Sequence, residues 1–413
     1  MSMMYDFNQP GVSSTRQLIN ISRQPHETAM PVFIGYVRNH EAKHQHVFRI
    51  QSLHDFQTKF GGGIDGGYLF SSLSLYFNNG GGECYVISLG VKENVASDPV
   101  SGYAGVFDLI LDEPEITLLV LPEMVNLKPE EWLKLVTLVG RACMEADNLF
   151  AIIDYPSDPD IARACNESGS WIGEERMAGY WPWIYHRTDS RQVQLDANPD
   201  NFSLTPPSGA IAAAMQQNDR QRGLWRAPAN IPIEKAIRPE FNHLHPVTLF
   251  HATPGTGRSV NQIRSFPGRG VRVWGCRTLT TSSDVRKLYI QNVRLVRWLT
   301  QTLKGALRPF VYEQNNEITW YRIHTLIRRH LKVLWEQGGL IGEMEEDAYL
   351  IEVGGEVGMS EAEMLNGLLR VRVGIATHRP AEFIRINLDF YINSSSPPSE
   401  ENHPSGELYE KSL

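Results

Sequence analysis

The chain has 413 residues, of which 42% are hydrophobic and 21% charged, and its formal net charge is −8. This composition is typical of a soluble globular protein, and the length allows two or three domains with a sizeable core. No run of about 18 apolar residues occurs, so the sequence predicts no membrane span and no direct membrane insertion. The first residues lack the basic and apolar segments of a secretory signal, and we therefore expect assembly in the cytoplasm.

No metal or cofactor site is predicted. The four cysteines are far apart in the sequence, at Cys84, Cys143, Cys165 and Cys276. Their spacing matches no zinc or redox motif, so we expect buried free thiols. The histidines of residues 40–46 have only Glu41 beside them, and no further ligand completes a metal-binding set.

Both ends of the chain lack the pattern of a core element. Residues 1–29 are mostly polar and predict an extended arm. Residues 394–413 are polar and acidic, which is typical of a segment that does not fold alone. We therefore divide the chain into an N-terminal arm (1–29), a central α/β domain (30–250), a C-terminal core domain (251–381) and a C-terminal strand with a polar tail (382–413).

A strand–helix–strand pattern occupies residues 117–154. Apolar runs at 117–122 and 148–154 predict buried strands, and Pro129 favours the first turn of the helix between them. Such a unit makes its two strands parallel neighbours, which predicts a mixed α/β fold. Asp154 would lie at the carboxyl end of its strand, a favoured catalytic position, so an α/β enzyme with a site near Asp154 is one alternative. No phosphate loop, nucleophile elbow or second carboxylate accompanies it.

The rest of the chain carries further patterned segments. Residues 178–184 predict a strand, and 208–215 predict a helix of small residues pressed closely against a sheet. Apolar stripes predict long helices over 285–303 and 320–334. Ser360 and Glu363 form the capping box of a short helix, and residues 382–393 alternate as a half-buried strand does.

The charge is unevenly distributed. Residues 258–336 contain 15 Lys and Arg against 4 Asp and Glu, whereas residues 340–369 contain 8 acidic residues and no Lys or Arg. A basic block followed by an acidic block suits a surface that meets copies of itself, or another tube, through complementary charge. Nucleic-acid binding by the basic block is a second alternative. Its arginines lie on amphipathic helices without interleaved exposed aromatics, and the overall charge is negative, which disfavours that reading.

Several motifs, in order, resemble those of the contractile tail-sheath family, which is found in phage tails, tailocins and extracellular injection systems. The first are Pro10-Gly11-Val12, the strand at 31–35, and Phe-Asn-Asn-Gly-Gly-Gly-Glu-Cys-Tyr-Val at 77–86. Core motifs at 205–230 and 260–279 follow, and then segments at 292–295, 310–315, 334–342 and 379–384. The resemblance covers most of the chain.

The resemblance implies a structural protein without enzymatic activity or cofactor. Subunits of this family form hexameric rings that stack as a helical assembly around an inner tube, and contraction drives the tube into a target cell. The implied partners are further copies of the chain, the inner tube protein, other sheath paralogues, and baseplate and terminal cap proteins, with no nucleic acid. After cytoplasmic assembly, the chain would be part of a released extracellular particle or a virion tail. The length fits the compact sheaths of extracellular injection particles.

The resemblance also implies which residues make the assembly contacts. Both arms would add strands to neighbouring subunits, through Pro10, Gly11 and Val12 at one end and Phe383, Ile384, Ile386, Leu388 and Phe390 at the other. The family places a helix of the C-terminal domain against the tube. The acidic helix at 360–369 is our candidate, with Glu361 and Glu363 as the contact residues. Ordinary helix capping on a solvent face is the alternative for these two carboxylates.

Overall fold

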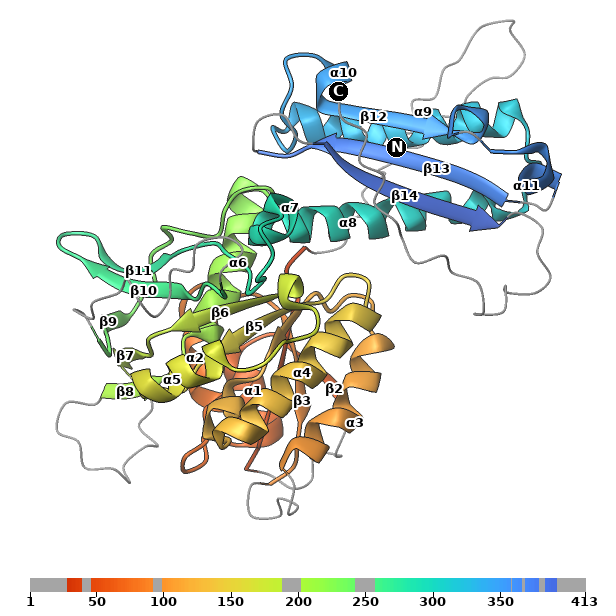
Figure 1. The fold of residues 1–413 in the computed structure, drawn as a ribbon. Helices are drawn as coiled ribbons and strands as arrows, with labels where there is room; N and C mark the ends of the chain where they lie inside the picture. Colours follow the sequence, from red (N-terminus) through yellow and green to blue (C-terminus); the bar gives the residue numbers. More distant parts are fainter. Residues whose placement is uncertain are drawn as a thin grey trace, which may run out of the picture.

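A computed structural model describes residues 28–38, 46–91, 99–187, 202–241, 257–357, 359–365, 368–378 and 383–391. These residues form two units joined through one long helix (Figure 1). The first unit is a three-layered α/β/α body, and the second is an antiparallel sheet packed against helices. Pro10, Gly11 and Val12, which were predicted to pair with a neighbour, lie outside the described residues.

The first unit is built on an eight-stranded sheet with the order β11-β10-β6-β5-β4-β1-β3-β2. Its strands are β1 (Pro31–Gly35), β2 (Val47–Ile50), β3 (Cys84–Ser88), β4 (Leu118–Val120), β5 (Phe150–Asp154), β6 (Met177–Trp181), β10 (Asn261–Phe266) and β11 (Gly270–Trp274). The strands from β10 to β3 in this order are parallel, and an antiparallel strand closes each edge. The parallel strand–helix–strand unit predicted at 117–154 is confirmed.

Helices cover both faces of this sheet because successive strand residues point to opposite sides. They are α1 (Leu53–Phe60), α2 (Leu69–Asn78), α3 (Pro99–Leu111), α4 (Pro129–Glu145), α5 (Pro159–Glu167) and α6 (Ser208–Arg222). Leu119 and Ile153 face the apolar cluster that contains α3, α4 and α5. Their neighbours Val120 and Ile152 face the cluster that contains α1, α2 and α6. Asp154 is the last residue of β5 and contacts the first residue of α6.

Short elements connect the main ones. A small three-stranded sheet has the order β8-β7-β9, with β7 (Ile184–Arg187), β8 (Phe202–Thr205) and β9 (Ala236–Pro239). The described 3-10 turns are η2 (Pro122–Asn126), η3 (Glu174–Arg176), η4 (Arg308–Tyr312) and η5 (Gly354–Val357).

The second unit is an antiparallel sheet with the order β12-β13-β14. Its elements are α8 (Ile290–Leu307), α9 (Glu317–Glu336), α10 (Glu345–Ala348), α11 (Glu361–Leu365), β12 (Tyr349–Val353), β13 (Leu368–Ala376) and β14 (Phe383–Tyr391). One stripe of α9, made by Ile323, Ile327, Leu331 and Leu334, packs with β12 and β13 in a third apolar cluster. The helical spacing of these residues explains why α9 presents one apolar face to the sheet.

The structure divides two predicted elements. The helix predicted over 285–303 is divided at Tyr289, whose backbone is extended, into α7 (Val285–Leu288) and α8. The backbone of Ile290 donates to Cys276 and that of Thr278 donates to Leu288, and these long-range bonds compete with the helix at this point. The strand predicted over 178–184 is also divided, into β6 and β7. Pro182 lies at the division, where it has no N–H to continue a ladder.

The two units do not meet where the sequence pattern placed the boundary. The predicted boundary at residues 250 and 251 lies outside the described residues. Strands β10 and β11, which we assigned to the C-terminal domain, belong to the first sheet, since β10 pairs in parallel with β6. The chain then enters α8, which runs from the first unit into the second (Figure 1).

Candidate assembly interfaces

The C-terminal strand β14 pairs with β13 of its own chain along its whole length. The antiparallel register runs from Leu368 opposite Tyr391 to Ala376 opposite Phe383. The predicted exchange residues thus have defined positions: Ile384, Ile386 and Leu388 stand opposite Ile375, Val373 and Val371, and Phe390 stands opposite Leu369. Those four β13 residues are buried in the apolar cluster of the second unit. The outer edge of β14 pairs with no strand among the described residues.

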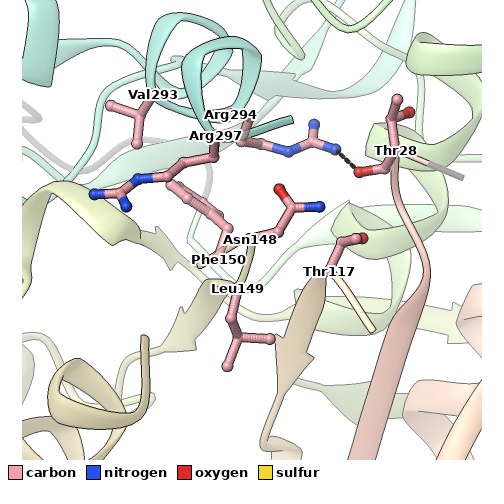
Figure 2. Close-up of a pocket in the computed structure, with 8 residues that line it drawn as sticks. All are labelled: Thr28, Thr117, Asn148, Leu149, Phe150, Val293, Arg294 and Arg297. Atoms are coloured by element: carbon pink, nitrogen blue, oxygen red, sulfur yellow. Dashed lines mark hydrogen bonds between the residues drawn. The ribbon is translucent and has the colours of Figure 1, made fainter. Parts of the chain in front are cut away.

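The N-terminal segment enters the body beside α8, and polar contacts hold it there (Figure 2). Thr28 Oγ1 donates to Asp219 Oδ2 at 2.7 Å, and Arg294 Nη2 donates to the Thr28 carbonyl at 2.8 Å. Arg294 Nη2 also lies 2.6 Å from Asp219 Oδ2, with both side chains almost fully buried. Residue 28 is thus fixed at the point where the predicted arm meets the body. These contact residues were not predicted as a site.

The helix predicted over 360–369 is shorter in the structure: α11 ends at Leu365, and Leu368 and Leu369 belong to strand β13. This helix is held by contacts inside its own chain. The capping box is confirmed: the Ser360 backbone donates to Glu363 Oε2 at 2.9 Å, and the Glu363 backbone donates to Ser360 Oγ at 3.3 Å. The bonds from Ser360 lower the pKa of Glu363. Arg370 Nη2 adds an ion pair to Glu363 Oε1 at 3.1 Å. The structure does not describe the side chain of Glu361, and contact with a tube by either residue stays a prediction.

The outer face of α9 and the turn before it expose large apolar side chains. Tyr312 is 89% exposed, Tyr321 73% and Ile318 72%. Basic residues share this helix face, and two of them converge on one carboxylate: Arg328 and Lys332 lie 2.7 and 3.0 Å from Glu345. The hydrogen bonds from Arg328 and Lys332 lower the pKa of Glu345 to about 2. This face therefore combines exposed aromatic area with positive charge, which is typical of contact surfaces.

The long basic block does not form one continuous basic surface. Arg258 pairs with Glu174 at 2.8 Å, and only 5% of the Arg258 side chain is exposed. Arg294 is equally buried against Asp219. Because phosphate contact requires exposed cations, these arginines cannot serve a nucleic acid. Burial therefore removes these two of the 15 Lys and Arg residues of the block from any surface that could contact phosphates.

Asp154 does not have the surroundings of a catalytic carboxylate. It is fully buried, and its Oδ1 accepts the backbone N–H of Ser208 at 3.0 Å. Burial raises its pKa to about 7, although the backbone hydrogen bond from Ser208 opposes that rise. The backbone carbonyl of the same residue accepts from Trp132 Nε1 at 3.2 Å. These contacts give Asp154 a structural role: it fixes the start of α6 against β5.

The described residues offer no other chemical site. No group of three or more His, Cys, Asp or Glu side chains among them could hold a metal ion. The four cysteines are free thiols. Cys84, Cys143 and Cys165 are buried as predicted, whereas Cys276 is partly exposed, which the prediction did not allow for. No described helix is long and apolar enough to cross a membrane.

Two solved structures match this fold over nearly the whole chain at substantial sequence identity. A chain in the cryo-EM structure of the anti-feeding prophage baseplate in the contracted state is 28% identical, with a TM-score of 0.76, and the match covers 94% of this chain and 98% of that chain. A chain of the PVC sheath complex, from an extracellular contractile injection system in the contracted state, is also 28% identical, with a TM-score of 0.69 and coverage of 93% and 97%. The chain is a contractile sheath protein.

The sheath fold extends to more distant proteins. The crystal structure of a sheath tail protein from Desulfitobacterium hafniense is 7% identical, with a TM-score of 0.61, and the match covers 92% of this chain and all of that chain. This likeness concerns the fold alone. No protein-family model matches the sequence. No curated protein matches it either. The sheath protein is a structural subunit and not an enzyme, which agrees with the burial of Asp154.

Sequence reasoning missed the contacts that fix Thr28 in this sheath protein. Two signals were present. Gln216 and Asp219 are three residues apart on α6, so they share one face of that helix. Arg294 lies inside the family-like segment at 292–295. Neither signal reveals that the side chains of Asp219 and Arg294 meet at Thr28. That meeting depends on how α6 and α8 lie relative to each other in the fold.

Proposed function

We propose that this sheath protein polymerises into rings stacked around an inner tube, and that contraction of the stack drives the tube into a target cell. The observation that carries the proposal is the 28% identity, over 93% of this chain and 97% of the other, with a chain of a contracted sheath complex. A six-fold ring is supported by a chain of the six-fold symmetrised anti-feeding prophage baseplate, which is 27% identical with a TM-score of 0.67. The particle would act outside the cell that assembled it.

The position of β14 supports assembly by strand exchange. In the single chain, this strand supplies the third strand of its own sheet. Main-chain hydrogen bonds hold a strand at a sheet edge whichever subunit supplies it, and the alternating side chains fix the register. The same strand can therefore leave β13 of its own chain and take the equivalent place in a neighbour. Such an exchange links subunits at low cost, because each lost contact is replaced by an identical one.

A disulfide tests this exchange directly. Val371 and Leu388 stand opposite each other in the β13–β14 register. With Val371→Cys and Leu388→Cys, oxidation of the isolated chain should close the bridge within one chain. Oxidation of assembled sheath should instead give covalent ladders of two or more chains on a non-reducing gel. Leu388→Cys alone is the control, because it adds a thiol without a partner. Only single-chain products from assembled sheath would exclude exchange of β14.

The N-terminal arm is proposed to supply a second linking strand, through Pro10, Gly11 and Val12. Thr28 and Ala29 already contact the body, since Gln216 Nε2 donates to the Ala29 carbonyl at 2.9 Å. A chain that begins at Thr28 should therefore fold but fail to form long sheaths. Removing residues 1–29 would combine two effects, the loss of the arm and the loss of the contacts that Thr28 and Ala29 make with the body. Long sheaths from the chain that begins at Thr28 would show that the arm is dispensable.

Two surfaces are candidates for the tube. The acidic helix α11 carries Glu361 and Glu363, and the outer face of α9 carries the basic and aromatic patch. A contact held by charge can be released when the sheath widens, whereas a large apolar seam would resist release. We keep α11 as the proposed contact and α9 as the next candidate.

The overall proposal is tested by mixing the purified chain with the inner tube protein of its particle and imaging the product in negative stain. Striated cylinders of uniform width are expected, and shorter, wider cylinders after triggering. Discrete globules under all conditions would contradict the proposed polymer. Incubation of the assembled product with nucleic acid at physiological salt should give no complex.

A further inference from the structure

The buried pair of Arg294 and Asp219 lies where three parts of the molecule meet. Arg294 is on α8, near the point at which that helix passes from one unit to the other: Ile290 and Val293 belong to the apolar cluster of the first unit, whereas Leu295 belongs to that of the second. Asp219 is on α6, a core helix of the first unit. Thr28 is the first described residue of the N-terminal segment, and Figure 2 shows its carbonyl facing the Arg294 guanidinium.

The contacts among these three residues form a closed set. Arg294 donates to both carboxylate oxygens of Asp219, at 2.6 and 3.3 Å, and to the Thr28 carbonyl at 2.8 Å. The Thr28 hydroxyl donates to Asp219 at 2.7 Å. Only 5% of the Arg294 side chain and 2% of the Asp219 side chain are exposed. Charge-assisted bonds in so dry a place are short and directional, so they fix one backbone position firmly.

The two residues that follow are held in the same way. Gln216 Nε2 donates to the Ala29 carbonyl at 2.9 Å, and Gln216 is itself fixed by Tyr76, whose hydroxyl donates to it at 2.8 Å. The Met30 backbone donates to Thr117 Oγ1 at 2.7 Å. Three successive residues are thus fixed by side chains from α6, from α8 and from Thr117, the residue before β4. All three precede β1, which begins at Pro31.

We propose that the Arg294–Asp219 pair anchors the N-terminal arm and passes tension from the arm to α8, and so to both units of the subunit. This rests on the proposed function, in which the arm links subunits while the sheath contracts. Tension on an arm without such an anchor would fall on the single side-chain bonds to Ala29 and Met30, and then on the end of β1. With the anchor, several buried bonds must break together. The pair is a positioning element and contacts no ligand.

The chain contains a matched control for this anchor. Arg258 and Glu174 form a second buried ion pair, at 2.8 Å, in the same unit. Arg258 also donates to the carbonyls of Asn166 and Gly169. Among the described residues, the hydrogen bonds and the ion pair of these two side chains do not reach residues 28–30. Breaking it should therefore destabilise the fold at least as much as breaking the anchor, but without releasing the arm.

The anchor variant is Arg294→Met with Asp219→Leu, because apolar replacement of both partners avoids an unpaired buried charge. The control variant is Arg258→Met with Glu174→Leu. Amide hydrogen exchange of the isolated full-length chain is measured for residues 29, 30 and 32. We expect exchange about tenfold faster in the anchor variant and unchanged in the control. Thr28→Val, which removes one donor and keeps the size, should give a smaller increase of about threefold.

The second measurement follows sheaths through contraction. Sheaths of the anchor variant should break between subunits when they contract, whereas those of the control variant and the unaltered chain stay continuous. Unchanged exchange at residues 29–32 in the anchor variant would overturn the anchor. Faster exchange with continuous contracted sheaths would overturn its role in passing tension. If the unaltered chain forms no sheaths, the proposed function and the tension role fail together, while the exchange result still decides the anchor.

Discussion

Asp154 accepts the backbone N–H of Ser208 at 3.0 Å, across the junction between β5 and the first turn of α6. The carboxylate is fully buried, and its second oxygen has no hydrogen-bond partner among the described residues. Burial disfavours the charged form of a carboxylate, and it does so more strongly when one of the two oxygens accepts no hydrogen bond. This relationship makes the stability of the first unit depend on pH.

The sign of that dependence follows from the raised pKa. Asp154 has a pKa of about 7 in the folded chain and an ordinary value of 3.8. Between these values the folded state holds the proton more tightly than the unfolded state, so stability falls as the pH rises through this window. His186 acts in the opposite direction at lower pH, because burial lowers its pKa to about 4 and its protonation favours unfolding.

We therefore predict that Asp154→Asn stabilises the chain at about pH 8 by roughly 1–3 kcal/mol more than at about pH 5. The asparagine oxygen can still accept from Ser208, so the start of α6 is kept. Urea midpoints at the two pH values measure the difference, and the His186 contribution cancels because both chains share it. Parallel pH profiles for the two chains would show that Asp154 does not titrate in this window.

Gly209 permits the close approach of α6 to α2. A Cβ at this position would lie 2.1 Å from the Ser72 carbonyl oxygen, which is backbone and cannot move aside easily. Gly209→Ala should therefore destabilise the chain by about 2–3 kcal/mol. Gly305→Ala is the matched control, because Gly305 is also helical and nothing lies within 4 Å of its Cβ position. The control should gain about 0.5–1 kcal/mol from helix propensity. Equal melting temperatures for both variants would contradict the close approach.

Leu388→Pro should abolish assembly while leaving the folded body intact. Proline removes a backbone donor and fixes φ at about −65°, so β14 cannot keep a regular ladder in its own chain or in a neighbour. Ile386→Pro should act in the same way, and Leu388→Ile is the control that keeps the ladder. Circular dichroism should show unchanged helix content, and negative-stain images should show no sheaths. Contracting sheaths of normal length from either proline variant would count against strand exchange.

Charge reversal tests the tube contact on α11. With Glu361→Lys and Glu363→Lys, the yield of tube-filled sheaths should fall, while empty or irregular sheath still forms. Because Glu363 also caps its helix and pairs with Arg370, the control is Glu361→Gln with Glu363→Gln, which keeps an acceptor for Ser360. A smaller loss is expected in that control. If both variants give the usual yield of tube-filled sheaths, the contact lies elsewhere, and the outer face of α9 is tested next.

Local patterns in the sequence determined several elements correctly. Apolar runs around Pro129 predicted β4, α4 and β5, because buried parallel strands and their crossover helix have distinct periods. Ser360 and Glu363 predicted their capping box, since both partners lie within one helical turn. The order of short motifs indicated the sheath family, and the full-length structural matches agree with it. All these signals act between residues close in the sequence.

The tertiary structure alone decided the long-range relationships. Tyr289 breaks a helix that its neighbours favour, because residues 276–278 supply competing backbone partners. Thr28 meets Asp219 across 191 positions, and Asp219 meets Arg294 across 75. A buried polar side chain needs a hydrogen-bond partner, but the sequence does not show which residue that partner is. The place of β14 at the edge of its own sheet was equally hidden, because main-chain hydrogen bonds look the same whichever chain supplies the strand.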